Sequence, residues 1–160
     1  MAILTKSGRV GMAEAMAAQP VFMAWGRGDP EWGESPPGES VEATALNQVI
    51  GYRKAARVRF CTPDPEGDIV VSSGRFRISD TPTNHLYLQF LFDFNNAPDE
   101  VIREMGIYLG AQPNAGLPPG QEYFQPDELE HKGTLLLLEY RKPLYRDIGV
   151  RETFEYVITL

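Results

Sequence analysis

A helical repeat of hydrophobic positions occurs at the start of the chain. Within residues 5–18, Val10, Ala13 and Ala17 recur at helical spacing, and either Thr5 or Ser7 suits the N-cap. The repeat predicts a short helix with a weak apolar stripe, which needs a partner surface to be stable. A second helical segment is predicted over residues 40–50, with Ser40 as its cap.

Most of the remaining chain alternates between hydrophobic and polar residues with a period of two. Strands are predicted over residues 21–25, 52–60, 75–79, 85–94, 101–109, 134–140 and 153–160. The clearest is 85–94, where every even position is apolar and two of the five odd positions, Tyr87 and Leu91, are too. A strand that is apolar on both faces belongs in the middle of a sheet.

Two long connections are rich in turn-forming residues. Residues 26–40 contain nine glycine, proline or serine residues and predict a surface loop, whereas residues 110–125 are predicted to cover a sheet edge or to reach a neighbouring chain. The elements together predict a mainly β (α+β) fold, namely an antiparallel β-sandwich-like domain with an N-terminal helix and long Gly/Pro loops. We expect one domain over 1–160, with a helix, strand and flexible loop region in 1–50 and a β-rich core in 51–160.

Composition narrows the classes of partner. Fifteen Lys and Arg residues stand against 22 Asp and Glu residues, for a formal net charge of −7, so neither nucleic acid nor a membrane surface is an expected partner. One cysteine, Cys61, cannot form an internal disulfide, and two histidines supply little for a zinc site. We therefore expect no metal, no structural disulfide and no membrane span, in a protein made in a cytoplasm.

The short motifs that could carry chemistry are each better explained structurally. Gly26-Arg27-Gly28 lacks the third glycine of a dinucleotide loop, and the acidic residues of the segment 64–68 read as a turn. Cys61 is expected to be an inert, buried thiol. We therefore predict no enzymatic activity, no catalytic residues and no cofactor, although a carboxylate pair assembled in space is left open by the sequence.

Aromatic and charged residues instead suggest an interface. Residues 53–77 contain six basic and three acidic residues, while residues 93–130 contain eight acidic residues and one basic residue. Such asymmetry fits charge pairing between copies or with another protein, and equally an ordinary surface with internal ion pairs. Trp32 and Tyr123 lie in Gly/Pro loops, where aromatic rings can bind a protein or a sugar. The candidate interface residues are Trp32, Arg57, Arg59, Arg75, Arg77, Arg103, Tyr123 and Phe124.

Four segments, taken in order, resemble the N-terminal domain of bacteriophage tail-collar fibre proteins and related small tail or baseplate proteins. These segments are LTKSGR (4–9), FMAWGRGD (22–29), TALNQVI (44–50) and VIREMGIY (101–108). In the last of them, Arg103 and Glu104 should point to opposite faces of a strand and find separate partners, while Gly106 allows a close approach.

The resemblance implies a virion structural protein of the phage tail or baseplate, synthesised in the host cytoplasm. In fibre proteins this domain precedes a long trimeric shaft, for which 160 residues leave no room. We therefore expect an assembly or adaptor component that connects tail parts or anchors a fibre. Its expected partners are other tail, baseplate or fibre proteins, and a homo-oligomer, trimer or hexamer, is expected in the assembly. The alternative is a carbohydrate- or receptor-binding module of a tail or cell-surface assembly.

Overall fold

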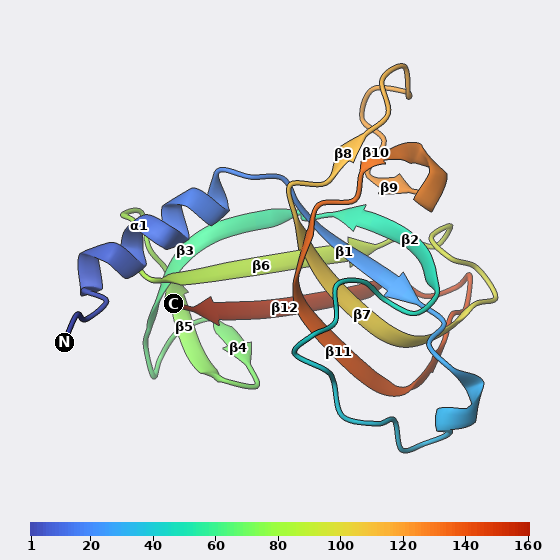
Figure 1. Cartoon of the computed structure of the whole chain (residues 1–160), viewed down its shortest axis with the longest axis horizontal. Helices are drawn as coiled ribbons and strands as arrows, with labels where there is room; N and C mark the ends of the chain where they lie inside the picture. Colours follow the sequence, from blue (N-terminus) through green and yellow to red (C-terminus); the bar gives the residue numbers. More distant parts are fainter. The chain divides into compact units, whose positions relative to one another are not determined.

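The computed structural model describes residues 1–160 (Figure 1). The chain divides into two compact units, and each unit consists of segments that alternate along the sequence with those of the other. Unit 1 comprises residues 1–19, 55–90 and 153–160, and unit 2 comprises residues 20–54 and 91–152. The expectation of a single domain stays a prediction.

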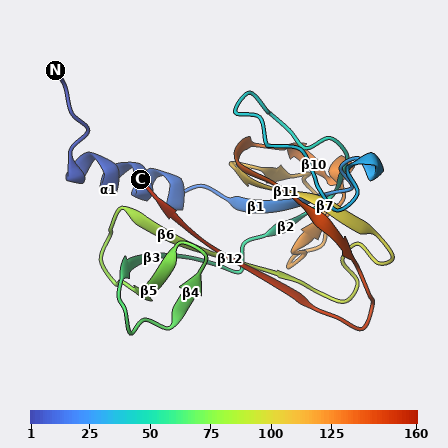
Figure 2. The same ribbon diagram turned by 90° about the horizontal axis from the view of Figure 1, so that it is seen from below.

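Unit 1 is built on one antiparallel sheet and one helix. Its elements are α1 (Lys6–Ala17), β3 (Arg57–Pro63), β4 (Ile69–Val71), β5 (Gly74–Ile78), β6 (His85–Phe92) and β12 (Glu152–Thr159), the last two running into unit 2 at one end. The strand order is β12-β6-β3-β5-β4, and Figure 2 shows β3, β4 and β5 side by side. The core on one face of this sheet consists of Cys61, Ile69, Phe76 and Tyr87.

The predicted N-terminal helix is confirmed. Thr5 adopts an extended conformation and its side-chain oxygen accepts a hydrogen bond from the backbone N–H of Gly8 at 3.1 Å. This contact satisfies one of the free donors of the first helical turn. Ala13 is the residue of α1 that is fully buried, which agrees with a narrow apolar stripe.

Unit 2 contains a second five-stranded sheet and the long loops. Its elements are β1 (Val21–Gly26), η1 (Pro30–Trp32), β2 (Val49–Lys54), β7 (Val101–Leu109), β8 (Gln112–Pro113), β9 (Tyr123–Phe124), η2 (Pro126–Glu128), β10 (Leu129–His131) and β11 (Thr134–Tyr145). The strand order is β11-β7-β1-β2-β9, and β8 pairs with β10. Figure 1 shows β7 between β1 and β11. The core on one face consists of Phe22, Ala24, Leu46, Tyr52, Tyr108, Ala111, Phe124 and Leu129.

The strand predictions hold where alternation is strong. In β6, Leu86, Leu88, Phe90 and Phe92 are buried, and this strand lies between β12 and β3, as expected of a central strand. The connection 110–125 does cover a sheet edge, because its strand β9 pairs with β2. The predicted fold class, mainly β with antiparallel strands, one N-terminal helix and long Gly/Pro loops, is confirmed.

Two predictions are wrong, both where contacts distant in sequence decide the backbone. Residues 40–48 form no helix, since the N–H of Leu46 is bound by the Tyr108 hydroxyl and other N–H groups of this segment are bound by Glu104. Residues 52–60 are two strands, β2 and β3, separated at 55–56. The break occurs because Lys54 donates to the carbonyl of Glu122, whereas Ala56 donates to that of Gln89.

Candidate interaction surfaces

The four arginines of β3 and β5 do not form one basic face. Arg59 lies opposite Tyr87 on β6, while Arg77 lies opposite Thr62 on β3. Since side chains alternate along a strand, Arg57 and Arg59 point to one face of the sheet of unit 1, and Arg75 and Arg77 point to the other. All four are exposed. The structure therefore gives two pairs of arginines rather than a continuous basic surface.

Each of these arginines also has a partner within unit 1. Arg59 forms an ion pair of 3.5 Å with the exposed Asp80, and Arg77 forms one of 3.4 Å with the half-buried Asp64; pairs in which the arginine is solvent-exposed stabilise little. The Arg57 guanidinium lies 5.5 Å from the centre of the Tyr87 ring, and the Arg75 Nε donates to the carbonyl of Gly67. Arg59 and Arg77 are thus paired with carboxylates, whereas Arg57 and Arg75 are held by uncharged groups.

The two aromatic residues of β9 lie on opposite faces of their strand. Phe124 is 3% exposed and packs edge-on against Phe22 in the core of unit 2. Tyr123 lies opposite Arg53 on β2. Its hydroxyl fills the space beside Gly51 that any side chain at that position would occupy. Burial raises the pKa of Tyr123 to about 12. Phe124 is therefore a core residue, and Tyr123 is a half-buried strand residue and not an exposed loop residue.

Folding does bring Trp32 and Arg103 together. Trp32 is half-buried on η1, and its ring lies 4.6 Å from that of Tyr140 on β11. Both Trp32 and the Cβ of Arg103 press against Gly28, whose φ of +59° and lack of a side chain permit the contact. Beside this ring is an open hollow of about 380 Å³, lined by Gly28, Asp29, Pro30, Trp32, Asn47 and Gln48 and called the Trp32 hollow below.

A buried carboxylate fixes the walls of the Trp32 hollow. Glu104 of β7 is 0% exposed and accepts hydrogen bonds from the N–H groups of Gly28, Asn47 and Gln48, at 3.2, 3.0 and 2.8 Å, and from the Asn47 side chain at 3.1 Å. Arg103, on the opposite face of β7, donates to the carbonyl of Arg27 at 3.1 Å. The expectation that these two residues find separate partners is therefore confirmed.

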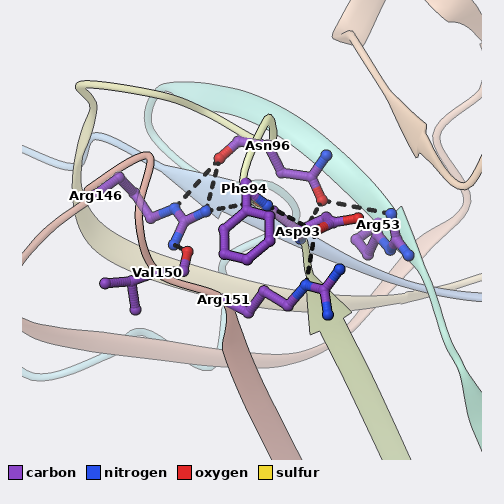
Figure 3. A network of polar contacts seen from close by, with 7 residues as sticks. All are labelled: Arg53, Asp93, Phe94, Asn96, Arg146, Val150 and Arg151. Carbon is purple, nitrogen blue, oxygen red and sulfur yellow. Dashed lines mark hydrogen bonds and ion pairs between the residues drawn. The ribbon is translucent and has the colours of Figure 1, made fainter.

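A second organised region joins two turns of unit 2: residues 93–100, between β6 and β7, and residues 146–151, between β11 and β12. We call it the turn pair (Figure 3). Arg146 is 5% exposed, and its guanidinium donates to the carbonyls of Asp93 at 2.8 Å, Asn96 at 3.1 and 3.2 Å and Val150 at 3.0 Å. One buried cation thus ties the two turns together.

The inner and outer sides of the turn pair differ. On the inner side, the Arg146 guanidinium lies 5.0 Å from the centre of the Trp25 ring, which stacks on Phe92 at 3.6 Å. On the outer side, Arg151 pairs with Asp93 at 2.9 Å and lies over Phe94 at 4.5 Å. Backbone donation from Phe94 and the Arg151 charge lower the pKa of Asp93.

The turn pair also stores backbone strain and exposes apolar surface. Ala97 and Asp99 have φ angles of +51° and +61°, which side chains disfavour. Phe94, Ile148 and Val150 remain 38%, 63% and 44% exposed. The turn pair therefore combines strained backbone, a buried cation and exposed apolar side chains. Sequence reasoning missed Arg146 because its partners are backbone carbonyls.

The net charge of the chain resides in unit 2. Unit 1 contains six basic and six acidic residues, whereas unit 2 contains nine basic and sixteen acidic residues, a net of −7. Five of those acids lie between Gly28 and Gly51, a segment without lysine or arginine. Arg27, just before this segment, forms a bidentate ion pair with Glu100, which raises the pKa of the Arg27 guanidinium.

Groups with potential reactivity are isolated from one another. No group of three or more His, Cys, Asp or Glu side chains is placed to hold a metal ion. The His85 ring contacts the Thr159 hydroxyl at 2.8 Å, and burial lowers its pKa. No helix has the length and apolar composition required to cross a membrane.

The Cys61 thiol is expected to resist alkylation in the folded protein. It is 0% exposed, and burial, which disfavours the thiolate, raises its pKa to about 11. At pH 8 an ordinary thiol is thiolate about 100 times more often than one with this pKa. Iodoacetamide labelling followed by mass spectrometry should therefore be slow in buffer and fast in 8 M urea, and equal rates would show that Cys61 is accessible.

A known protein family matches the chain over its whole length. No curated protein matches it. Among protein families, residues 1–160 match the family described as baseplate wedge 3 tail fiber network component. With its full length matched, the chain belongs to the family of baseplate wedge 3 tail fiber network components.

Proposed function

We propose that this protein is a structural adaptor of the phage baseplate, which connects tail parts or anchors a fibre within the tail fibre network. The family match over residues 1–160 carries the proposal. Membership in this family indicates a component of the virion tail that interacts with other baseplate or tail fibre proteins. A structural role also accords with reactive groups that are buried, paired or isolated.

The turn pair is the surface that best suits a contact with a neighbouring chain. Phe94, Ile148 and Val150 offer apolar side chains on a backbone that Arg146 holds fixed, so little conformational entropy is lost when they are covered. Its exposed apolar side chains allow contact between like-charged copies, because the charges of Arg151 and Asp93 beside them are paired with each other. We therefore propose that the turn pair contributes to the expected trimer or hexamer.

An aspartate on the turn pair is expected to weaken assembly. In Ile148→Asp, the carboxylate would be buried without a partner at the interface, which should reduce association by about 30-fold or more. Light scattering on the purified protein measures the oligomer, and complementation of a phage that lacks the gene measures assembly of infectious particles. Wild-type protein should restore infectivity, and the variant should not.

Val70→Asp is the matched control, because Val70 is 61% exposed against 63% for Ile148 but lies in unit 1. It should behave as wild type in both assays. Particles that assemble normally without the protein would contradict the adaptor role itself. If the gene is required for infectivity but Ile148→Asp forms the oligomer and restores infectivity like the wild type, the turn pair is not the interface. The adaptor role would then still stand.

A further inference from the structure

We propose that the Trp32 hollow binds a lysine- or arginine-bearing segment of a different baseplate protein, with the cationic side chain against the Trp32 ring. This inference rests on the proposed adaptor role and gives the adaptor a second surface, distinct in residues from the turn pair. Three features of unit 2 carry it: an accessible aromatic ring, a preformed backbone frame and an excess of negative charge.

The ring is held in place and yet accessible. Trp32 packs against Gly28 and, at 4.6 Å between ring centres, against Tyr140, but its side chain is only half-buried and lines an open hollow. Indole is the aromatic group that attracts cations most strongly through its π face. The chain's other tryptophan, Trp25, is 0% exposed and already lies against Arg146.

The frame around the hollow is preformed. Glu104 holds the N–H groups of Gly28 and Gln48, which lie on two separate segments of the lining. The Asp29 carboxylate also lines the hollow and accepts from the N–H of Glu31 at 2.9 Å, which fixes its direction. A preorganised site loses little entropy when it binds, so even one side chain of a partner can be recognised.

Charge selects the kind of occupant. The segment from Gly28 to Gly51 carries five carboxylates and no basic residue. Of the nearby cations, Arg27 is neutralised by Glu100, which leaves Arg103, whose guanidinium donates to the carbonyl of Arg27, as the one positive charge against these carboxylates. A neutral sugar would gain nothing from negative charge, whereas a cationic side chain is attracted by the Asp29 carboxylate in the lining, by the excess of acidic residues in unit 2 and by the ring. A second copy of this chain would bring the same excess of negative charge to the Trp32 hollow, so a different, basic protein suits this surface better.

Binding of hexa-arginine to the purified full-length chain tests this assignment, with calorimetry for affinity and acrylamide quenching to follow Trp32. We expect hexa-arginine to bind, to protect Trp32 from quenching and to dissociate as salt is raised from 50 to 500 mM. Hexa-glutamate should not bind. Trp32→Ala should weaken binding about tenfold, and Trp32→Phe should recover part of it.

Two matched controls separate the hollow from general charge attraction. Asp29→Asn removes one charge while keeping the turn, and it should weaken binding several-fold. Asp147→Asn removes the same charge from an equivalent turn, where Asp147 accepts from the N–H of Gly149 at 2.8 Å, and it should not. Tyr145→Ala, at a ring 71% exposed in the same unit, should also leave affinity unchanged.

Several results would overturn the inference. If Asp29→Asn and Asp147→Asn weaken hexa-arginine binding equally, the binding reflects net charge and not the hollow. If hexa-arginine does not bind at all, the hollow is not a site for cationic side chains. Binding of maltotriose or chitotriose that is lost in Trp32→Ala, without hexa-arginine binding, would assign the hollow to a sugar. None of these outcomes touches the phage complementation result, so failure here is distinguishable from failure of the adaptor role.

Discussion

Replacement of Arg146 by methionine is expected to lower the free energy of unfolding by about 3 to 5 kcal/mol, as measured by urea denaturation. The guanidinium donates four hydrogen bonds to three backbone carbonyls, those of Asp93, Asn96 and Val150. Methionine fills much of the same volume and donates nothing, so carbonyls in the interior of the turn pair lose their partners. The strained turn at Ala97 and Asp99 would also lose its support.

Arg151→Met provides the matched control for Arg146→Met. Arg151 lies in the same turn pair, and its side chain is 66% exposed in an ion pair with Asp93, so its loss should cost less than about 1 kcal/mol. Arg146→Lys should recover little stability, because one ammonium group cannot reach three carbonyls in the fork geometry of a guanidinium. Equal effects of the two methionine substitutions would show that Arg146 does not organise the turns.

The elements that could be predicted from the sequence are those whose cause is local. The alternation in residues 85–94 specifies a two-sided strand whatever surrounds it, and Thr5 caps a helix that begins one residue later. Residues 40–50 have a helical pattern, yet their backbone donors are taken by Glu104 and Tyr108, more than 50 residues away along the chain. Local periodicity contains no signal for such contacts.

The same distinction applies to the candidate surfaces. Trp32 and Arg103 could be singled out as an aromatic residue in a polar loop and a charged residue in an apolar strand, and the structure brings both against Gly28. The arginines at 57–77 suggested one basic face, but strand register divides them between two. Arg146 and Glu104 bind mainly backbone groups, and backbone groups have no sequence signature. A charged residue within an otherwise apolar strand, as in VIREMGIY, is the one available sign of such a role.

Glu104→Gln should lower the free energy of unfolding by about 2 to 4 kcal/mol, although the side chain keeps its size. The carboxylate accepts four hydrogen bonds and is 0% exposed. Glutamine retains one acceptor oxygen and turns an N–H₂ group toward donors, so at least one buried N–H of Gly28, Asn47 or Gln48 is left unpaired. Urea denaturation measures the loss, and hydrogen exchange at Gly28 and Gln48 should accelerate beyond what global unfolding explains.

The consequence for function separates this change from a general loss of stability. Because Glu104 holds both sides of the Trp32 hollow, Glu104→Gln should increase the quenching of Trp32 by acrylamide and weaken hexa-arginine binding at temperatures where the chain is still folded. Glu122→Gln removes the same charge from an exposed site in unit 2 and should leave quenching unchanged. If acrylamide quenches Trp32 equally in both variants, the Glu104 carboxylate does not hold the walls of the hollow. If only Glu104→Gln responds, the same buried group both stabilises the sheet and shapes the surface that binds.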